Sequence, residues 1–333
     1  MTELPTDSHE DRLIAKYFKP LATDPGAFGL VDDAALVTPP PGCDLVLKAD
    51  AIIGGIHFFP EDPAEAVARK ALRVNISDLA AKGATPVGCL LSLGLPAGFS
   101  ETWLAGFSGG LGADIALYNC PLFGGDTVRT PDTIMVSVAV IGAVPYGGMV
   151  KRAGANPGDR LFVTGTLGDA ALGLILRKDT EAADRWGLTN AENDFLAERY
   201  LIPEPRLAIG PVLREFASAA MDVSDGLVGD LGKLCRASGF SAEVDAGNIP
   251  LSAAAQKALA AEPSLMETVL TNGDDYEVLA AVPAGYLDGF RAAATKAGVA
   301  VADIGVVAAG EDAPHFVQDG RLMKFARRSY SHF

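Results

Sequence analysis

The sequence predicts an α/β (α+β) protein of two domains. Apolar segments of strand length alternate with longer segments whose apolar residues recur at helical spacing. A Gly- and Pro-rich stretch at residues 145–158 separates two such alternations, so we place the domains at residues 1–148 and 149–333. Each half also carries a Ser-Asp pair inside or opening a predicted helix, Ser77-Asp78 and Ser224-Asp225, which hints at two units of related layout.

Two long helices and several apolar strands are predicted in the first half. One helix, residues 65–82, repeats its apolar side chains with a helical period and ends before Gly83, a residue that favours a helix C-cap. Asp78 lies inside it, where aspartate has poor propensity; it either faces solvent or points from a buried helix into a charged site. The other elements expected here are a helix at 10–19 that Pro20 stops, strands at 28–37, 44–53, 89–96 and 134–144, and a helix at 101–117.

The second half opens with a strand, a glycine turn and a helix at residues 159–174. Such turns can hold phosphate groups at a helix N-terminus, although this spacing matches neither common phosphate-binding pattern. We expect the polar segment 179–194 to be an exposed loop or a frayed helix. The remaining predictions are a helix at 207–219, a buried strand that breaks into a helix near Ser224, extended pieces at 243–245 and 249–251, an acidic turn that leads into an apolar strand at 270–282, a helix at 287–297 and a strand at 303–307.

The composition excludes several classes of protein. A formal net charge of −15 argues against nucleic-acid binding, which needs a basic face. An acidic protein can bind an anionic substrate only where metal ions or local Arg and Lys side chains reverse the field. The N-terminus is polar and acidic, unlike a secretory signal, and the longest apolar run, residues 134–144, is too short to cross a bilayer. We therefore expect a soluble, cytoplasmic protein without a membrane or nucleic-acid partner.

The cysteines indicate a reducing environment. They are widely spaced and form no C-x-x-C pair, so neither a zinc site nor a disulfide framework is predicted. We expect buried free thiols. The residues are Cys43, Cys89, Cys120 and Cys235.

The segment Asp222-Val-Ser-Asp-Gly226 is the most informative stretch for function. Two carboxylates three residues apart at a strand-to-helix turn repel each other, and burial increases that cost. A divalent cation would remove the repulsion, and hard oxygen ligands suit Mg2+. The alternative is ordinary helix capping, in which Ser224 or Asp225 closes a helix start and Asp222 lies at a solvated strand end.

Further acids interrupt apolar elements or lie at strand ends. Of the adjacent pair Asp32 and Asp33, only one can point into a site, because neighbouring residues of a strand face opposite sides. Several carboxylates that converge on one site suit a cluster of Mg2+ ions, which in turn suits a nucleotide polyphosphate. The chain has no kinase H-R-D or D-F-G set. The candidate carboxylates are Asp33, Asp50, Asp78, Asp126, Asp222 and Asp225.

Three weaker signals accompany these acids. The pair Gly124-Gly125 before Asp126 lets a ligand approach the backbone closely. Lys151-Arg152 is the clearest local basic pair, and on charge alone a surface role fits as well as phosphate binding. A lone histidine beside an aromatic residue, as His57 is, is more often a packed residue than a catalytic one.

Seven short motifs follow one another in order along nearly the whole chain. They are Asp32-Asp-Ala-Ala-Leu36, Gly54-Gly-Ile-His-Phe58, Val74-Asn-Ile-Ser-Asp-Leu-Ala-Ala-Lys-Gly-Ala84, Gly124-Gly-Asp-Thr127, Val163-Thr-Gly-Thr-Leu-Gly-Asp169, Asp222-Val-Ser-Asp-Gly-Leu227 and Gly273-Asp-Asp-Tyr-Glu277. As a set they are highly specific, and they resemble the thiamine-monophosphate kinase family.

The resemblance implies a fold and a reaction. The fold is the two-domain architecture shared with aminoimidazole ribonucleotide synthetase, in which the N-terminal sheet pairs with that of a second subunit into a barrel across a homodimer. The reaction is phosphoryl transfer from ATP to thiamine monophosphate, with Mg2+, giving ADP and thiamine diphosphate. Because the acceptor phosphate oxygen is mostly deprotonated near neutral pH, direct in-line transfer needs positioning and charge neutralisation rather than a strong base.

The resemblance also assigns site residues. The six candidate carboxylates would be magnesium ligands, with Asp222 and Asp225 central to catalysis. Two departures from the family pattern concern the site residues: Lys48-Ala49 stands where a hydroxyl pair is common before Asp50, and Asp274, on the substrate side, stands where glutamate is frequent. The residues implied to contact ATP are Gly125, Asp126, Arg152 and Ser224, and those implied to lie along thiamine monophosphate are His57, Asp274 and Tyr330.

Three other interpretations compete with this one. The first is selenophosphate synthetase, a family marked by a reactive Cys or selenocysteine near the N-terminus. Here the first cysteine is Cys43, which lies in a Pro-Gly turn. The hydrogenase-maturation carbamoyl dehydratase ends in a reactive Cys, whereas this chain ends in Phe333. A non-catalytic nucleotide-binding or metal-buffering module would keep the acids without phosphorylating a substrate.

Overall fold

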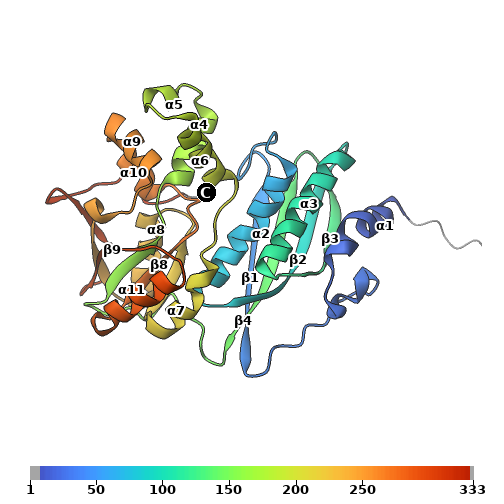
Figure 1. Cartoon of the computed structure of the whole chain (residues 1–333), viewed down its shortest axis with the longest axis horizontal. Coiled ribbons are helices and arrows are strands. Elements are labelled where there is room, and N and C mark those ends of the chain that lie inside the picture. Colours follow the sequence, from blue (N-terminus) through green and yellow to red (C-terminus); the bar gives the residue numbers. More distant parts are fainter. Residues whose placement is uncertain (1–7, 331–333) are drawn as a thin grey trace, which may run out of the picture. The chain divides into compact units, whose positions relative to one another are not determined.

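The computed structural model describes residues 8–330 and divides the chain into two compact units (Figure 1). The first contains residues up to Ile76 together with Pro86–Pro145. The second contains Ser77–Thr85 together with the chain from Tyr146 onward. The end of one helix thus groups with the second unit, which the linear sequence does not suggest. The predicted domain limits stay a prediction, and their outermost residues lie outside the described part.

The first unit is built on a sheet that, within residues 8–330, has four strands in the order β1-β4-β2-β3. β1 pairs antiparallel with β4, and β2 pairs parallel with β3. Helices α2 and α3 lie side by side on one face of this sheet (Figure 1), and Asp114 of α3 accepts hydrogen bonds from Arg69 and Arg73 of α2. The elements are β1 Cys43–Ile53, α2 Ala64–Ala81, β2 Thr85–Pro96, α3 Glu101–Tyr118, β3 Leu122–Thr130 and β4 Met135–Pro145.

The other face of this first sheet is apolar and exposed. Along β4, every second residue from Val136 to Val140 is buried, which marks the face that the helices cover. On β1, Leu47 points the other way and is 72% exposed. Further exposed apolar side chains from three strands are Leu45, Leu90 and Val128. An open apolar sheet face of this kind is typical of an interaction surface.

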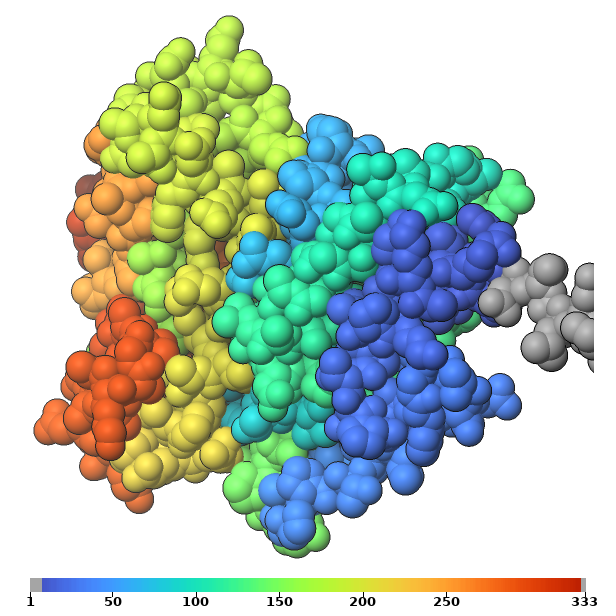
Figure 2. All heavy atoms as spheres, turned by 45° about the vertical axis from the view of Figure 1, so that its right-hand side comes forward, coloured from blue at the N-terminus to red at the C-terminus, as the bar shows by residue number. Residues whose placement is uncertain are grey.

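The N-terminal segment is helical, as predicted, but Pro20 does not stop it. It consists of α1 His9–Leu13, a π-helical turn Ile14–Phe18 and a 3-10 turn Lys19–Leu21. Proline is tolerated early in a helical turn because its missing N–H has no intrahelical partner there. The segment lies against α3 (Figure 2), where Lys16 Nζ is 3.0 Å from a carboxylate oxygen of Glu101.

The prediction of a strand at residues 28–37 is wrong. A 3-10 turn covers Pro25–Leu30, and the residues that follow form neither helix nor strand. Phe28, Gly29 and Leu30 have φ of 49°, 62° and 57°, a left-handed conformation that is incompatible with a strand. Alternation along a strand therefore cannot decide which of the two neighbouring acids points into a site.

The second unit is built on a sheet that, within the described residues, has seven strands in the order β11-β10-β7-β9-β5-β8-β6. Within residues 8–330, β10 and β7 are the only neighbouring strands of this sheet that run parallel, and the other neighbouring strands are antiparallel. The strands are β5 Arg160–Thr164, β6 Ala219–Val223, β7 Ser241–Asp245, β8 Glu277–Val282, β9 Val301–Ala308, β10 His315–Gln318 and β11 Arg321–Leu322.

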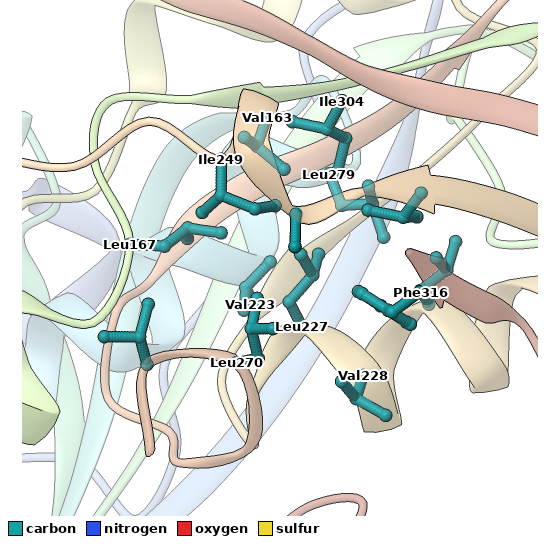
Figure 3. Packing of buried hydrophobic residues seen from close by; sticks show 14 of the residues in the cluster. Val163, Leu167, Val223, Leu227, Val228, Ile249, Leu270, Leu279, Ile304 and Phe316 are labelled. Atoms are coloured by element: carbon teal, nitrogen blue, oxygen red, sulfur yellow. The ribbon is translucent and has the colours of Figure 1, made fainter. Parts of the chain in front are cut away.

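Helices cover both faces of the central strands of this second sheet. In β5, Leu161 and Val163 belong to one buried cluster, shown in part in Figure 3, and Phe162 belongs to the other. The first cluster includes residues of α4, α6, α8, α9 and α10, and the second includes residues of α7 and α11. Burial on both faces explains why every residue of β6 and β8 is buried and why, apart from Asp222 and Glu277, all of them are apolar. The helices are α4 Asp169–Lys178, α5 Ala182–Arg185, α6 Asn190–Leu201, α7 Gly210–Phe216, α8 Leu227–Ser238, α9 Ala253–Ala261, α10 Leu265–Thr271 and α11 Leu287–Lys296.

The predicted α/β class is confirmed, with several local differences. The polar segment 179–194 contains α5 and the start of α6, where Thr189 and Glu192 form a capping box. The helix predicted at 207–219 is a 3-10 turn Leu207–Ile209 followed by α7, and it gives way to β6. Helices α9 and α10 and strands β10 and β11 were not predicted.

Two other expectations concern the surroundings of the protein. All four cysteines lie in the described part and have free thiols, although Cys43 is only half-buried. Burial raises the pKa of Cys235 to about 11, which makes this thiol poorly reactive near neutral pH. None of the helices within residues 8–330 has the length and apolar character that crossing a bilayer requires.

Candidate active site

The segment that joins β6 to α8 contains a buried, oriented carboxylate. Asp222, in β6, is 5% exposed, and the hydroxyl of Ser77 donates a hydrogen bond of 2.8 Å to its Oδ2. The flanking residues Met221 and Val223 belong to the core cluster on the opposite face of the strand. Asp222 is therefore not at a solvated strand end, and its orientation is fixed by a partner from the end of α2.

Helix α8 starts later than predicted, which makes the capping interpretation wrong. Its N-cap is Gly226, and no side chain of residues 8–330 makes a capping hydrogen bond there. Asp230, fully buried in the first turn, turns back instead: its Oδ2 accepts hydrogen bonds from the backbone N–H groups of Ser224 (3.0 Å) and Asp225 (2.9 Å). The side chains of Ser224 and Asp225 are thus not used to start the helix.

Lys233 neutralises both acids of this turn. Its Nζ is 2.5 Å from Oδ2 of Asp225 and 2.8 Å from Oδ1 of Asp230. Burial raises the pKa of Asp230, and the hydrogen bond from Lys233 opposes that effect only in part. Burial lowers the pKa of Lys233, but its hydrogen bonds to the two carboxylates outweigh burial, so this pKa is raised overall. Lys233 is therefore a cation at neutral pH.

The loop 273–276 packs directly on this turn. The backbone N–H of Asp274 donates to the carbonyl of Ser224 (2.9 Å), and that of Tyr276 donates to the carbonyl of Val223 (2.9 Å). Asp274 and Tyr276 have φ of 72° and 51°, a conformation that costs a non-glycine residue about 1–3 kcal/mol. A Cβ on Gly273 would lie 2.0 Å from the carbonyl oxygen of Ser224, so only glycine fits.

The C-terminal segment reaches the same place. The backbone N–H of Tyr330 donates a hydrogen bond of 3.0 Å to the carbonyl of Asp225. The hydroxyl of Tyr276 donates to Oδ1 of Asp274 over 3.3 Å. The structure thus gathers five of the predicted site residues around the β6–α8 junction: Asp222, Ser224, Asp225, Asp274 and Tyr330.

Two further candidates belong to the second unit. Asp78 is half-buried in α2 and directly follows Ser77, the hydrogen-bond donor to Asp222. Arg152 is exposed, and the carbonyl of the preceding Lys151 accepts a hydrogen bond of 2.9 Å from Ala220 of β6. The backbone beside Arg152 is therefore tied to the start of the strand that carries Asp222.

In the first unit, Asp33 and Asp126 line one cavity of about 570 Å³. Both acids are exposed, and neither side chain makes a hydrogen bond or ion pair with another described residue. Asp126 lies within β3 rather than at its end. Gly124 and Gly125 also line the cavity, and a Cβ on Gly125 would lie 1.7 Å from the carbonyl oxygen of Leu91. The fold therefore requires glycine at 125 before any ligand is considered.

Asp50 and His57 do not line this cavity. Asp50 is half-buried on the edge strand β1, with its Oδ1 3.1 Å from Nζ of Lys48. Lys48 belongs to the pair Lys48-Ala49 that departs from the family pattern. Nδ1 of His57 accepts a hydrogen bond of 3.0 Å from the backbone N–H of Ile53, which ties the histidine to the end of β1. This contact is that of a packed residue.

The described carboxylates form no ready-made metal cluster. Within residues 8–330, no group of three or more His, Cys, Asp or Glu side chains is arranged to hold a metal ion. The predicted ligands divide equally between the units, with Asp33, Asp50 and Asp126 in the first and Asp78, Asp222 and Asp225 in the second. Their chemistry fits Mg2+, because carboxylate oxygens are its preferred ligands and Asp33 and Asp126 have no competing partner among the described residues.

Comparison with known proteins identifies both units. Residues 31–144 match the family described as AIR synthase related protein, N-terminal domain, and residues 156–317 match the corresponding C-terminal domain. Thiamine-monophosphate kinase of Caulobacter vibrioides is 41% identical over 323 residues, 96% of this chain and 89% of that protein. The enzyme of the same name from Salmonella typhimurium is 39% identical over 97% of this chain and 98% of its own length.

This chain belongs to the thiamine-monophosphate kinase family. The crystal structure of a thiamine-monophosphate kinase from Stenotrophomonas maltophilia K279a has a TM-score of 0.82 and 37% identity, and the match covers 96% of this chain and 98% of that one. A structure of AaThiL complexed with AMPPCP and TMP has a TM-score of 0.76 and 30% identity, covering 92% and 97%. The predicted two-domain fold is confirmed.

One rival interpretation shares only the fold. Escherichia coli HypE, a hydrogenase maturation protein, has a TM-score of 0.76 but 18% identity over 96% of this chain and 98% of its own. Identity this low carries no information on activity. The two thiamine-monophosphate kinases match 96% and 97% of this chain at 41% and 39% identity, more than twice the identity to HypE.

The family motifs identify the site acids but not the residues that orient them through hydrogen bonds and ion pairs. Sequence analysis missed Asp230 and Lys233, although an acid in the first turn of a helix followed three residues later by lysine is a recognisable pair. It also missed Ser77 as the partner of Asp222, because 145 positions separate them in the sequence. Local patterns carry no signal for such a contact.

In this kinase-family chain, two buried acids of the motif 273–277 bond to residues of the glycine-turn motif 163–169. Glu277 is fully buried and accepts hydrogen bonds from Arg199 (2.9 Å), Arg206 (2.6 Å) and Thr164 (2.7 Å). One oxygen of its neighbour Asp275 accepts from the backbone N–H of Gly168 (2.8 Å), and the other is buried without a partner among residues 8–330. Burial raises the pKa of Asp275 well above its usual range. Glu277, at the start of β8, and Asp275, just before it, thus fix the position of the glycine turn 165–168 through Thr164 and Gly168.

Proposed function

We propose that this chain transfers a phosphoryl group from ATP to thiamine monophosphate, giving ADP and thiamine diphosphate. Two observations carry the proposal. The chain is 39–41% identical, over nearly its full length, to proteins named for that activity. The structure also gathers five motif residues at the β6–α8 junction. The AaThiL complex with AMPPCP and TMP supports an ATP-like nucleotide and TMP as the two ligands of the fold.

The transfer is proposed to be direct and in line, without a covalent enzyme intermediate. The acceptor is a phosphate oxygen that is already mostly deprotonated near neutral pH, so positioning and charge neutralisation supply most of the catalysis. When bound, Mg2+ supplies neutralisation of the phosphate charges. Its proposed ligands are Asp33, Asp50, Asp78, Asp126, Asp222 and Asp225.

The chain's own contacts support the roles of the second-unit acids. Ser77 holds Asp222 in one orientation, and Lys233 holds Asp225 while reducing the repulsion between the acids of the turn. We assign Gly125, Asp126, Arg152 and Ser224 to ATP by motif. We assign His57, Asp274 and Tyr330 to thiamine monophosphate; for Asp274, the strained loop and the Tyr276 hydroxyl support a fixed position.

The functional form is proposed to be a homodimer formed through the uncovered face of the first sheet. That face exposes apolar side chains from β1, β2 and β3, and a second copy would bury them. Light scattering after gel filtration should give twice the chain mass of 34.5 kDa. Leu47→Glu should give the single mass, whereas Leu117→Glu, on exposed α3 surface, should not. A monomeric wild-type protein at micromolar concentration would contradict this proposal.

The cytoplasmic location remains a proposal. The free thiols of all four cysteines, which lie within residues 8–330, are consistent with a reducing compartment.

The kinase proposal is tested by incubating the full chain with ATP, Mg2+ and thiamine monophosphate and separating the products by chromatography. Thiamine diphosphate and ADP should form in equal amounts, and neither should form in excess EDTA. A nucleotide-binding or metal-buffering module would bind ATP and yield no thiamine diphosphate, and that result would reject the proposal.

A further inference from the structure

A second cavity, of about 590 Å³, lies entirely within the second unit. One wall is a stripe of α8 formed by Gly229, Gly232, Lys233 and Arg236, which follow one another at helical spacing. Residues between 312 and 329 form another wall. None of the residues assigned above to ATP, thiamine monophosphate or Mg2+ lines this cavity. Its volume falls within the range of about 300–1,000 Å³ that is usual for small-molecule sites.

The cavity is basic although the chain is acidic. The whole sequence has 27 Lys and Arg against 42 Asp and Glu, yet the lining contributed by residues 8–330 includes two lysines and two arginines and only one acid, Asp312. Lys233 is paired with Asp225 and Asp230. The side chains of Arg236, Lys324 and Arg328 make no hydrogen bond or ion pair with any other residue of the described part. Unpaired cations around one hollow favour an anionic ligand.

The same cavity has an apolar side. Val228 of α8 and Phe316 of β10 line it, and Figure 3 shows both on one side of the core cluster. Phe325 also lines it, with its ring edge-on to that of Phe316 at a centroid distance of 5.4 Å. An aromatic wall beside guanidinium groups suits a ligand that has both a flat ring and phosphate oxygens, because arginine binds phosphate through its planar fork.

We propose that this cavity is a second ligand site, distinct from the reaction site, that binds an organic diphosphate with an aromatic ring, the class to which nucleoside diphosphates belong. Lys233 connects the two sites, because it lines the cavity and also bonds to Asp225. An anion bound here would compete with Asp225 for that cation. Binding at this site does not depend on the proposed kinase function; only the connection through Lys233 does.

The test is calorimetric titration of ADP into the full chain in EDTA, where the proposed reaction site lacks the Mg2+ that it needs for a polyphosphate. The wild type should bind about one ADP per chain, and Arg236→Gln/Arg328→Gln should weaken binding at least ~10-fold. The matched control is Lys178→Gln/Lys296→Gln, which removes two exposed charges outside the cavity and should keep the affinity within about twofold. Circular dichroism should show that all four altered side chains are dispensable for folding.

Two further titrations separate the parts of the ligand. Inorganic diphosphate should bind more weakly than ADP and lose affinity in the arginine variant, and adenosine should bind more weakly than either. Asp222→Ala should bind ADP in EDTA as the wild type does. The proposal is overturned if the wild type shows no saturable binding, if the arginine variant binds equally well, or if Asp222→Ala abolishes binding. Failure of the kinase assay with retained, arginine-dependent ADP binding would reject the function and leave this site standing.

Discussion

The acids of the two units differ in how the fold treats them. In the second unit, Asp222 and Asp225 each have a partner, Ser77 and Lys233, and a buried carboxylate holds the turn between them. In the first unit, Asp33 and Asp126 line a cavity, and their side chains bond to no other described side chain or backbone group. The same residue type therefore serves in a fixed network in one unit and as an unpaired group in the other.

This difference separates structural from functional constraint. An exposed, unpaired acid contributes little to stability, so its presence in a family motif points to ligand binding. A buried acid in a hydrogen-bond network affects both folding and activity, because removing it leaves its donors unsatisfied.

Substitution of either second-unit acid at the turn should abolish most activity. Asp222→Ala and Asp225→Ala should each reduce the rate of thiamine diphosphate formation by roughly 10³-fold or more, the scale usual for removing a central charged group. The rate is measured by chromatography with ATP and Mg2+. Asp288→Ala, which removes an exposed acid away from the junction, should keep the wild-type rate. Near-normal turnover in both site variants would reject the metal-ligand account.

Stability should respond to Asp230 but not to Asp126. Asp230→Ala leaves two partly buried backbone N–H groups without their acceptor and leaves Lys233 with Asp225 alone, and we expect it to lower the free energy of unfolding by about 3 kcal/mol. Asp126→Ala should change it by less than about 0.5 kcal/mol. Urea denaturation measures both. Equal losses in the two variants would remove the proposed distinction between the units.

Gly125 should be needed for folding, independently of any contact with ATP. Gly125→Ala places a Cβ against the carbonyl of Leu91 and should destabilise the protein by about 1–3 kcal/mol. At Gly124 the nearest atom, in Leu90, is 3.6 Å away, so Gly124→Ala should be close to neutral. Thermal unfolding of the two variants without nucleotide distinguishes them. Identical melting temperatures would mean that the close approach at 125 is relieved at no cost.

The smallest expected effect is a pH dependence at Asp275. Burial raises its pKa in the folded state above the usual 3.8, so the folded state favours the protonated form. The stabilisation from this group is complete below the unfolded pKa and is lost as pH rises through the folded pKa. Asp275→Asn should therefore become more stable relative to wild type as pH increases from 5 to 8, as measured by urea denaturation at each pH. A difference that is constant, or that shifts towards wild type, would contradict this.

Much of the fold follows from local patterns. The apolar residues of 65–82 and 101–117 predicted α2 and α3 to within one residue at each end. The strand expected at 28–37 fails because three successive left-handed residues leave no hydropathy signal. Helix α6 was missed because its sequence is polar, and its capping box was the signal that could have found it.

The site was predictable in part. Motifs identified acids that the structure gathers at the β6–α8 junction, since local spacing fixes Asp222 and Asp225 on one turn. They could not show that Ser77 orients Asp222, that Asp230 holds the turn, or that Asp275 and Glu277 anchor the glycine turn. Those contacts depend on how the chain folds back on itself, which periodicity and propensity do not encode.

The most direct test of the central claim uses the acids without a structural role. The double variant Asp33→Ala/Asp126→Ala is prepared, its melting temperature is compared with that of the wild type, and thiamine diphosphate formation is followed over a series of Mg2+ concentrations. We predict an unchanged melting temperature together with loss of product formation at every Mg2+ concentration. Product formation at the wild-type rate, with the same dependence on Mg2+, would show that these carboxylates do not take part in the reaction.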